Sequence, residues 1–132
     1  MIEEKQFKKI IYQIFDDIFT LKKFDLLDTI YEKDAIFYDA RDVFRGRDAV
    51  KKMVIQRSQD IPNFRYEIDD IVIKGNKAAV RWHAIGKVDK DFAGFKAGGS
   101  ANYWGISMFE VNNEGILKNW GVSSTIDAPY HD

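Results

Sequence analysis

Asp39 is the carboxylate whose position in the sequence best suits proton transfer. It ends a short apolar segment, Ala-Ile-Phe-Tyr-Asp at residues 35–39, where a strand would meet the mouth of a pocket. Burial beside an apolar cavity disfavours a charged carboxylate, which raises its pKa and allows it to exchange a proton with a ligand. A structural role is the alternative, in which Asp39 caps the loop at 40–45 or pairs with Arg41. We predict Asp39 as a candidate general acid/base and leave the structural role open.

Three tryptophans, Trp82, Trp104 and Trp120, fall on three successive strand-like segments. An indole combines a large apolar surface with one N–H donor, so each could line a binding cavity. The alternative is that these rings fill the core or cover a dimer face. Walls of this kind suit a flat, apolar ligand. Further candidates for the lining are Tyr38, Phe64, Tyr66, Tyr103 and Met108.

Metal or cofactor chemistry has little support in the residue types present. The chain has two histidines and no cysteine, so we predict neither a transition-metal site nor a cofactor. His83 alternates with Trp82 on one strand, so the two side chains face opposite sides of the sheet. We expect His83 to be a surface or dimer-face residue.

Composition limits the partners and the compartment. Twenty basic and 21 acidic residues give a net charge of −1, whereas nucleic acids and anionic membrane surfaces are usually bound by a basic excess. No apolar run approaches the roughly 20 residues of a membrane span, and the N-terminus lacks the features of a signal peptide. We therefore expect a cytoplasmic protein that binds neither nucleic acid nor membrane.

The hydrophobic period changes once along the chain. Apolar residues recur every three or four positions over residues 2–22, which predicts an amphipathic helix. Shorter helices are predicted at 25–32 and 46–60, and Pro62 prevents the last from continuing. Period-two alternation follows, with a phase slip at Asp69-Asp70 that indicates a β-bulge. The predicted strands are 35–39, 64–74, 77–88, 100–111 and 116–125.

Helices that precede a run of strands indicate an α+β domain, with three N-terminal helices packed on a curved antiparallel sheet. At 132 residues, we expect one domain over 1–132. A curved sheet wrapped on a helix leaves a cavity between its concave face and that helix. Gly75-Asn76 is a hairpin signal, and the segment from Gly94 to Gly99 is expected to form a loop between two strands.

Several short motifs occur in a recognisable order. Residues 37–39 read Phe-Tyr-Asp and residues 44–50 read Phe-Arg-Gly-Arg-Asp-Ala-Val, which resembles the strand, loop and helix start of the nuclear-transport-factor-2-like superfamily. Residues 80–86, Val-Arg-Trp-His-Ala-Ile-Gly, resemble a strand of its SnoaL-like polyketide cyclases, as do Glu-Gly-Ile at 114–116 and Trp-Gly-Val at 120–122. The resemblance implies a cone-shaped, cystatin-like fold with an apolar pocket and a homodimer formed through the outer sheet face.

The resemblance also shows where familiar catalytic groups are replaced. Asp39 falls where ketosteroid isomerases of the superfamily carry their general base, but Phe15 stands in place of their oxyanion tyrosine and cannot donate a hydrogen bond. Ser124 stands where the cyclases carry an acid-base aspartate, and Val88 where they tend to carry a histidine. We expect Phe15 and Ser124 to contact a ligand without performing this chemistry.

The leading prediction is therefore binding of a small hydrophobic molecule, aromatic or polycyclic, in a pocket between sheet and helices. An enzyme of cyclase or isomerase type using Asp39 is the alternative. A structural or interaction module, whose pocket is filled by its own side chains, is the second alternative. A homodimer is expected because the strands carry apolar residues on both faces, such as Ile85, Ile106 and Phe109.

Overall fold

The computed structural model describes residues 2–39, 42–92, 94–114 and 117–124. Its helices are α1 (Glu4–Tyr12), η1 (Gln13–Thr20), η2 (Phe24–Leu26), α2 (Leu27–Ile30) and α3 (Arg47–Asp60). Its strands are β1 (Tyr31–Tyr38), β2 (Val43–Arg45), β3 (Phe64–Lys74), β4 (Lys77–Lys87), β5 (Ser100–Val111) and β6 (Leu117–Ser124).

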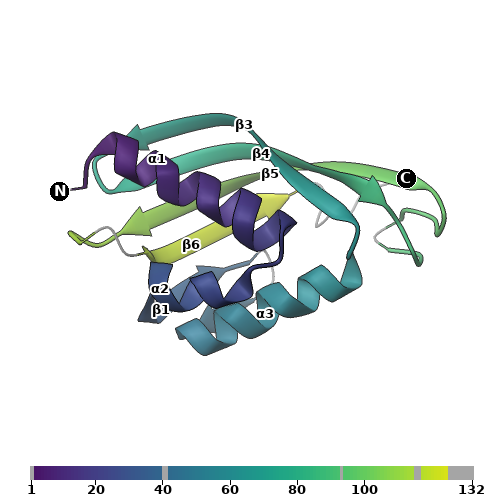
Figure 1. Cartoon of the computed structure of the whole chain (residues 1–132), viewed down its shortest axis with the longest axis horizontal. Coiled ribbons are helices and arrows are strands. Elements are labelled where there is room, and N and C mark those ends of the chain that lie inside the picture. Colours follow the sequence, from purple (N-terminus) through teal and green to yellow (C-terminus); the bar gives the residue numbers. More distant parts are fainter. Residues whose placement is uncertain (1, 40–41, 93, 115–116, 125–132) are drawn as a thin grey trace.

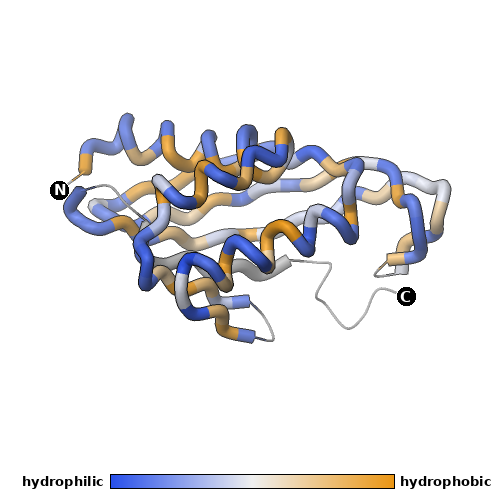
Figure 2. The backbone as a smooth tube through the Cα atoms, turned by 60° about the horizontal axis from the view of Figure 1, so that its bottom comes forward, coloured by the Kyte–Doolittle hydropathy of each residue, from blue (hydrophilic) through white to orange (hydrophobic). Residues whose placement is uncertain are grey.

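The first predicted helix is present, but it has two parts. α1 is an α-helix, whereas η1 continues it as a wider π-helix. Phe7, Ile11, Ile14, Phe15 and Ile18 of this helix are all fully buried, and Figure 2 shows hydrophobic residues recurring along it from the N-terminus. The apolar period therefore predicted the buried face correctly, while the change of helix type has no equally simple sequence signal.

The described strands form a six-stranded sheet in the order β2-β1-β6-β5-β4-β3. Neighbouring strands are antiparallel except β1 and β6, which run parallel. The register between β3 and β4 shifts between Ile68 and Asp70, which is the predicted bulge. β2 was not predicted, because three residues are too few to reveal a period-two pattern.

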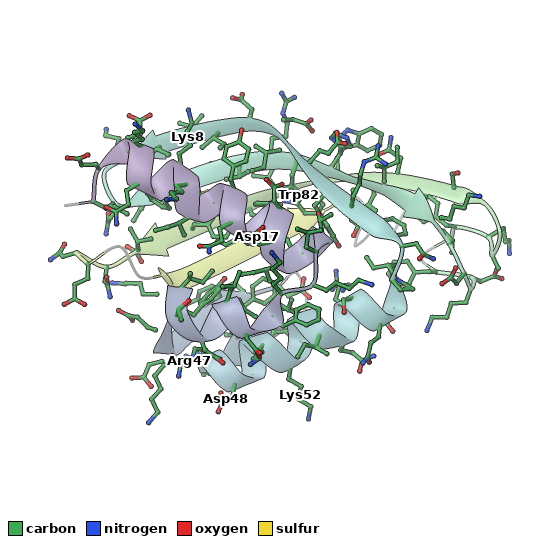
Figure 3. The ribbon with its side chains drawn as sticks, viewed as in Figure 1. Lys8, Asp17, Arg47, Asp48, Lys52 and Trp82 are labelled. Atoms are coloured by element: carbon green, nitrogen blue, oxygen red, sulfur yellow. The ribbon has the colours of Figure 1, made fainter. Side chains whose placement is uncertain are left out.

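One face of the sheet carries the helices. η1 packs on β3 and α3 packs on β1, and Figure 1 shows α1 crossing the long strands with α3 lying below them. Asp48 and Lys52 point away from the sheet on the outer side of α3 (Figure 3), whereas Val50 and Val54 are buried on its inner side. This arrangement confirms the predicted α+β class and cone-shaped fold. Among the described residues, no helix combines the length and apolarity needed to cross a membrane.

Candidate functional site

A pocket lies between the end of the first helix, the inner side of α3 and the concave face of the sheet. Its cavity volume is about 60 Å³, and apolar side chains make up most of its wall. Exposed Lys22 marks the side where it meets solvent. The residues that line it are Phe19, Lys22, Phe24, Phe37, Met53, Val54, Arg57, Ser58, Ile61, Tyr66, Trp82, Tyr103 and Ser107.

Trp82 is the central aromatic residue of this pocket. It is 5% exposed, and its ring centroid lies 5.6 Å from that of Tyr66 and 5.8 Å from that of Tyr103. Its indole Nε1 donates a hydrogen bond of 2.9 Å to the buried Oγ of Ser107. Trp82 lies between the sheet and η1 (Figure 3), where its ring packs against Phe15. Ring contacts and a hydrogen bond thus hold the indole in one orientation.

Gly105 provides the space that the indole occupies. It lies directly opposite Trp82 in the pairing of β4 with β5, and a Cβ atom at residue 105 would lie 2.2 Å from Cζ2 of Trp82. That separation is far shorter than a carbon–carbon contact of 3.5–4.0 Å. The position and orientation of the ring therefore depend on a residue without a side chain at 105.

Two tyrosine hydroxyls meet at the wall of the pocket. Tyr66 Oη and Tyr103 Oη are 3.1 Å apart, so one donates a hydrogen bond to the other. Burial raises the pKa of Tyr66 above its usual value, although the bond to Tyr103 and the charge of Arg57 act in the opposite direction. Tyr66 is therefore protonated at neutral pH and able to donate.

The backbone N–H of Tyr66 donates a hydrogen bond to Oγ1 of Thr20, which in turn donates to the Phe15 carbonyl, so the end of η1 is tied to β3.

The charged groups of the pocket come from the helices. Arg57 reaches the pocket from α3, and Lys22 follows the end of η1. Nη2 of Arg57 lies 3.7 Å from Oδ2 of Asp39, so Asp39 contacts a lining residue although it is not itself part of the lining. Asp39 thus lies next to the pocket, in contact with the guanidinium of a lining residue.

Three predicted ligand-binding residues lie elsewhere. Tyr38 is 42% exposed and its neighbour Phe37 lines the pocket instead, because successive side chains of a strand point to opposite faces. Trp104 is 50% exposed. It pairs with His83, whereas its neighbour Gly105 pairs with Trp82, so the side chains of Trp104 and Trp82 lie on opposite faces of the sheet. Phe15 is fully buried one layer behind the wall, in edge contact with Phe19 at 5.3 Å. None of these three residues belongs to the described lining of this pocket, and their contact with a ligand stays a prediction.

The remaining predicted residues divide into two groups. Tyr66 and Tyr103 line the pocket beside Trp82, whereas Met108 is exposed on the outer face and Phe64 is buried outside the lining. β6 places the backbones of Trp120 and Ser124 opposite Phe109 and Gly105, but their side chains lie outside what the structure describes.

Several pocket residues were missed by sequence reasoning. Phe19, Phe24 and Met53 carry no signal beyond hydrophobicity, and Lys22 and Arg57 resemble ordinary surface cations when read singly. Ser107 had a usable signal, because it is polar and shares the strand parity of Tyr103 and Phe109 on β5. In the described part of the chain, no group of three or more His, Cys, Asp or Glu side chains is arranged to hold a metal ion.

Comparison with known proteins identifies one sequence family and many solved structures of similar fold. The sequence model of the SnoaL-like polyketide cyclase family matches residues 9–128. No curated protein sequence is significantly similar to this chain.

Solved structures share the fold at low sequence identity. A proposed SnoaL-like polyketide cyclase from Jannaschia sp. CCS1 has a TM-score of 0.82 at 12% identity, over 93% of this chain and 88% of that one. IdmH, a proposed polyketide cyclase from Streptomyces antibioticus, has a TM-score of 0.78 at 19% identity, with 91% and 92% covered. AclR, a proposed hydroxylase from Streptomyces galilaeus, has a TM-score of 0.79 at 12% identity, with 95% and 82% covered. At these identities the likeness establishes the fold alone.

Proposed function

The chain belongs to the SnoaL-like polyketide cyclase family, and from its pocket we propose that it binds a small hydrophobic molecule with an aromatic or polycyclic skeleton. The observation that carries this proposal is the aromatic wall formed by Phe19, Tyr66, Trp82 and Tyr103. Flat rings stack on such side chains, while Ser107 and the tyrosine hydroxyls offer polar contacts that orient a ligand oxygen.

The size of the cavity limits how such a ligand is held. A volume of about 60 Å³ is smaller than the roughly 150 Å³ of an engineered cavity that binds one benzene. A ligand with one or more rings therefore extends toward solvent past Lys22, or flexible residues such as Met53 move aside. Either way, the outer part of the ligand meets the charged side chains of the pocket.

Tryptophan fluorescence tests this proposal directly. Flat polycyclic ketones and phenols should quench the emission saturably, because Trp82 lies in the pocket. The change Trp82→Phe should abolish the saturable component, whereas Trp104→Phe should retain it, since Trp104 is half exposed on the other face. If no compound quenches, or if the response depends on Trp104 instead, the pocket does not bind such ligands and a structural or interaction module becomes the better explanation.

An enzyme of cyclase or isomerase type using Asp39 remains the alternative function. The hydroxyl pair of Tyr66 and Tyr103 supports it, because these groups can polarise a ligand carbonyl. The weaker point is Asp39, which lies outside the lining and contacts the lining residue Arg57. A base in that position needs Arg57 to move, or a water molecule to relay the proton.

The change Asp39→Asn is expected to lower the free energy of unfolding by no more than about 1 kcal/mol, as is usual for one ion pair near the surface. Urea unfolding measures this. A much larger loss would show that Asp39 is chiefly a structural residue and would remove it as a candidate base. If a substrate is found, the same variant should abolish turnover if the protein is an enzyme that uses Asp39. It should retain ligand binding if the protein only binds its ligand.

We also propose a homodimer formed through the outer face of the sheet. Val72, Trp104, Ile106 and Met108 are all exposed there, and Val72 and Met108 each pair with Ala79, so the patch runs across β3, β4 and β5. Contiguous exposed apolar surface of this kind marks interaction sites.

Light scattering after gel filtration should give twice the chain mass for the wild type and the monomer mass for Ile106→Glu, because a buried unpaired carboxylate is costly. Tyr12→Glu is the control, since Tyr12 is similarly exposed but lies on α1. A monomeric wild type, or an Ile106→Glu variant that stays dimeric, would contradict this interface.

A further inference from the structure

The charges around the pocket are not balanced. Lys22 and Arg57 are the cationic residues of the described lining, which contains no carboxylate. Asp39 lies beside this lining, with its Oδ2 atom 3.7 Å from Nη2 of Arg57. That separation exceeds the usual length of a charge-assisted hydrogen bond. Among the lining residues and this one partner, two cations thus meet a single carboxylate.

Lys22 occupies an unusual backbone conformation. Its φ of 62° is the one positive value recorded for a non-glycine residue in the described chain. It follows the last turn of η1, where the N–H of Lys23 donates to the carbonyl of Asp17 at 2.9 Å. Helix ends of this form favour glycine, because a Cβ atom disfavours the left-handed region.

The lysine side chain connects the end of η1 with the segment that follows α3. Its Nζ donates a hydrogen bond of 2.7 Å to the carbonyl of Pro62, next to the lining residue Ile61. An ammonium group has three donors, so this contact still permits others to a ligand. Non-glycine residues in disfavoured conformations concentrate at binding sites, where the side chain has a use. A strained backbone and a cationic side chain thus coincide at one lining residue.

Arg57 extends the same positive region into the pocket. Its side chain is about one third exposed, and its charge acts on the partly buried Tyr66. A guanidinium presents several N–H donors in a plane that matches a carboxylate. A ligand whose ring lies against Trp82 therefore directs its outer part toward cationic donors.

We propose that the pocket prefers aromatic ligands that carry a carboxylate, which is bound by Lys22 and Arg57 while the ring packs at Trp82. This inference rests on the proposed function and specifies its ligand class. Neutral ligands of the same shape satisfy the aromatic wall but leave the positive charge uncompensated.

Two probes of nearly identical shape test the preference, namely 2-naphthoate and its neutral amide, 2-naphthamide. Isothermal titration calorimetry should give a roughly tenfold lower Kd for the acid at low salt, the ratio that corresponds to about 1.4 kcal/mol. The ratio should shrink between about 20 mM and about 300 mM NaCl, because salt screens partly exposed charges.

Variants separate the charge effect from the fold. Lys22→Gly supplies the residue that the backbone favours, so its melting temperature should equal or exceed that of the wild type, while the preference for 2-naphthoate should fall several-fold. Arg57→Gln should also reduce the preference. Asp39→Asn should act in the opposite direction and strengthen the binding of 2-naphthoate, because it removes the competing carboxylate beside Arg57.

The outcomes are distinguishable. If neither probe binds, the proposed function fails, and this inference fails with it. If both bind with equal affinity, or if the preference survives in both Lys22→Gly and Arg57→Gln, the pocket binds aromatic ligands but the carboxylate preference is wrong.

Discussion

Replacing Trp82 with alanine should lower the free energy of unfolding by about 3–5 kcal/mol, the usual cost of removing a buried aromatic ring. The ring is 5% exposed and packs against Phe15, Tyr66 and Tyr103. Its removal also leaves the buried hydroxyl of Ser107 without its partner Nε1.

Urea unfolding followed by far-UV circular dichroism measures this loss without relying on tryptophan emission. Trp104→Ala is the matched control, because it removes the same side chain from the other face, where it is 50% exposed. Measured at concentrations where both proteins are monomeric, the control should cost no more than about 1 kcal/mol. A larger loss in Trp104→Ala than in Trp82→Ala would mean that the faces of the sheet are assigned the wrong way round.

Adding a single methyl group in Gly105→Ala should destabilise the protein by about 1–3 kcal/mol or more, as overpacking of a core does. The new Cβ atom would lie 2.2 Å from Cζ2 of Trp82. The indole cannot easily move, because ring contacts and the Ser107 bond hold it. Gly121→Ala is the control, since its nearest neighbour would be the Cβ atom of Tyr38, at an ordinary distance of 3.7 Å.

The two changes should not be additive. In a Trp82→Ala background the added methyl group has space, so Gly105→Ala should cost far less there than in the wild type. A double-mutant cycle in urea measures this coupling. Additive losses would show that Gly105 is needed for a reason other than the fit of the indole.

The ligand-binding properties should follow the same geometry. Gly105→Ala displaces the indole that forms the wall of the pocket, so saturable quenching should weaken in this variant even where the protein remains folded. Gly121→Ala should leave quenching unchanged. This pair connects the packing of one strand on its neighbour with the proposed function.

Local pattern was sufficient to predict much of this protein. The apolar period gave the buried face of the first helix, and Pro62 correctly ended the helix before it. Alternation separated Trp82 from His83, and the phase slip at Asp69-Asp70 located the bulge. These features depend on residues close in sequence, so a single segment contains the information that determines them.

The composition of the pocket depended on contacts between distant segments. β5 has large side chains at both parities, with Tyr103 and Phe109 inward and Trp104 outward, so alternation alone could not say which set faces the helices and the pocket. The pairing of Gly105 with Trp82 decided it, because only there does the indole have space. Lys22 and Arg57 likewise look like separate surface cations in the sequence, and only the packing of helices on the sheet brings both to one cavity. Strand register and helix packing are properties of the whole fold, whereas side-chain alternation and helical period belong to each segment.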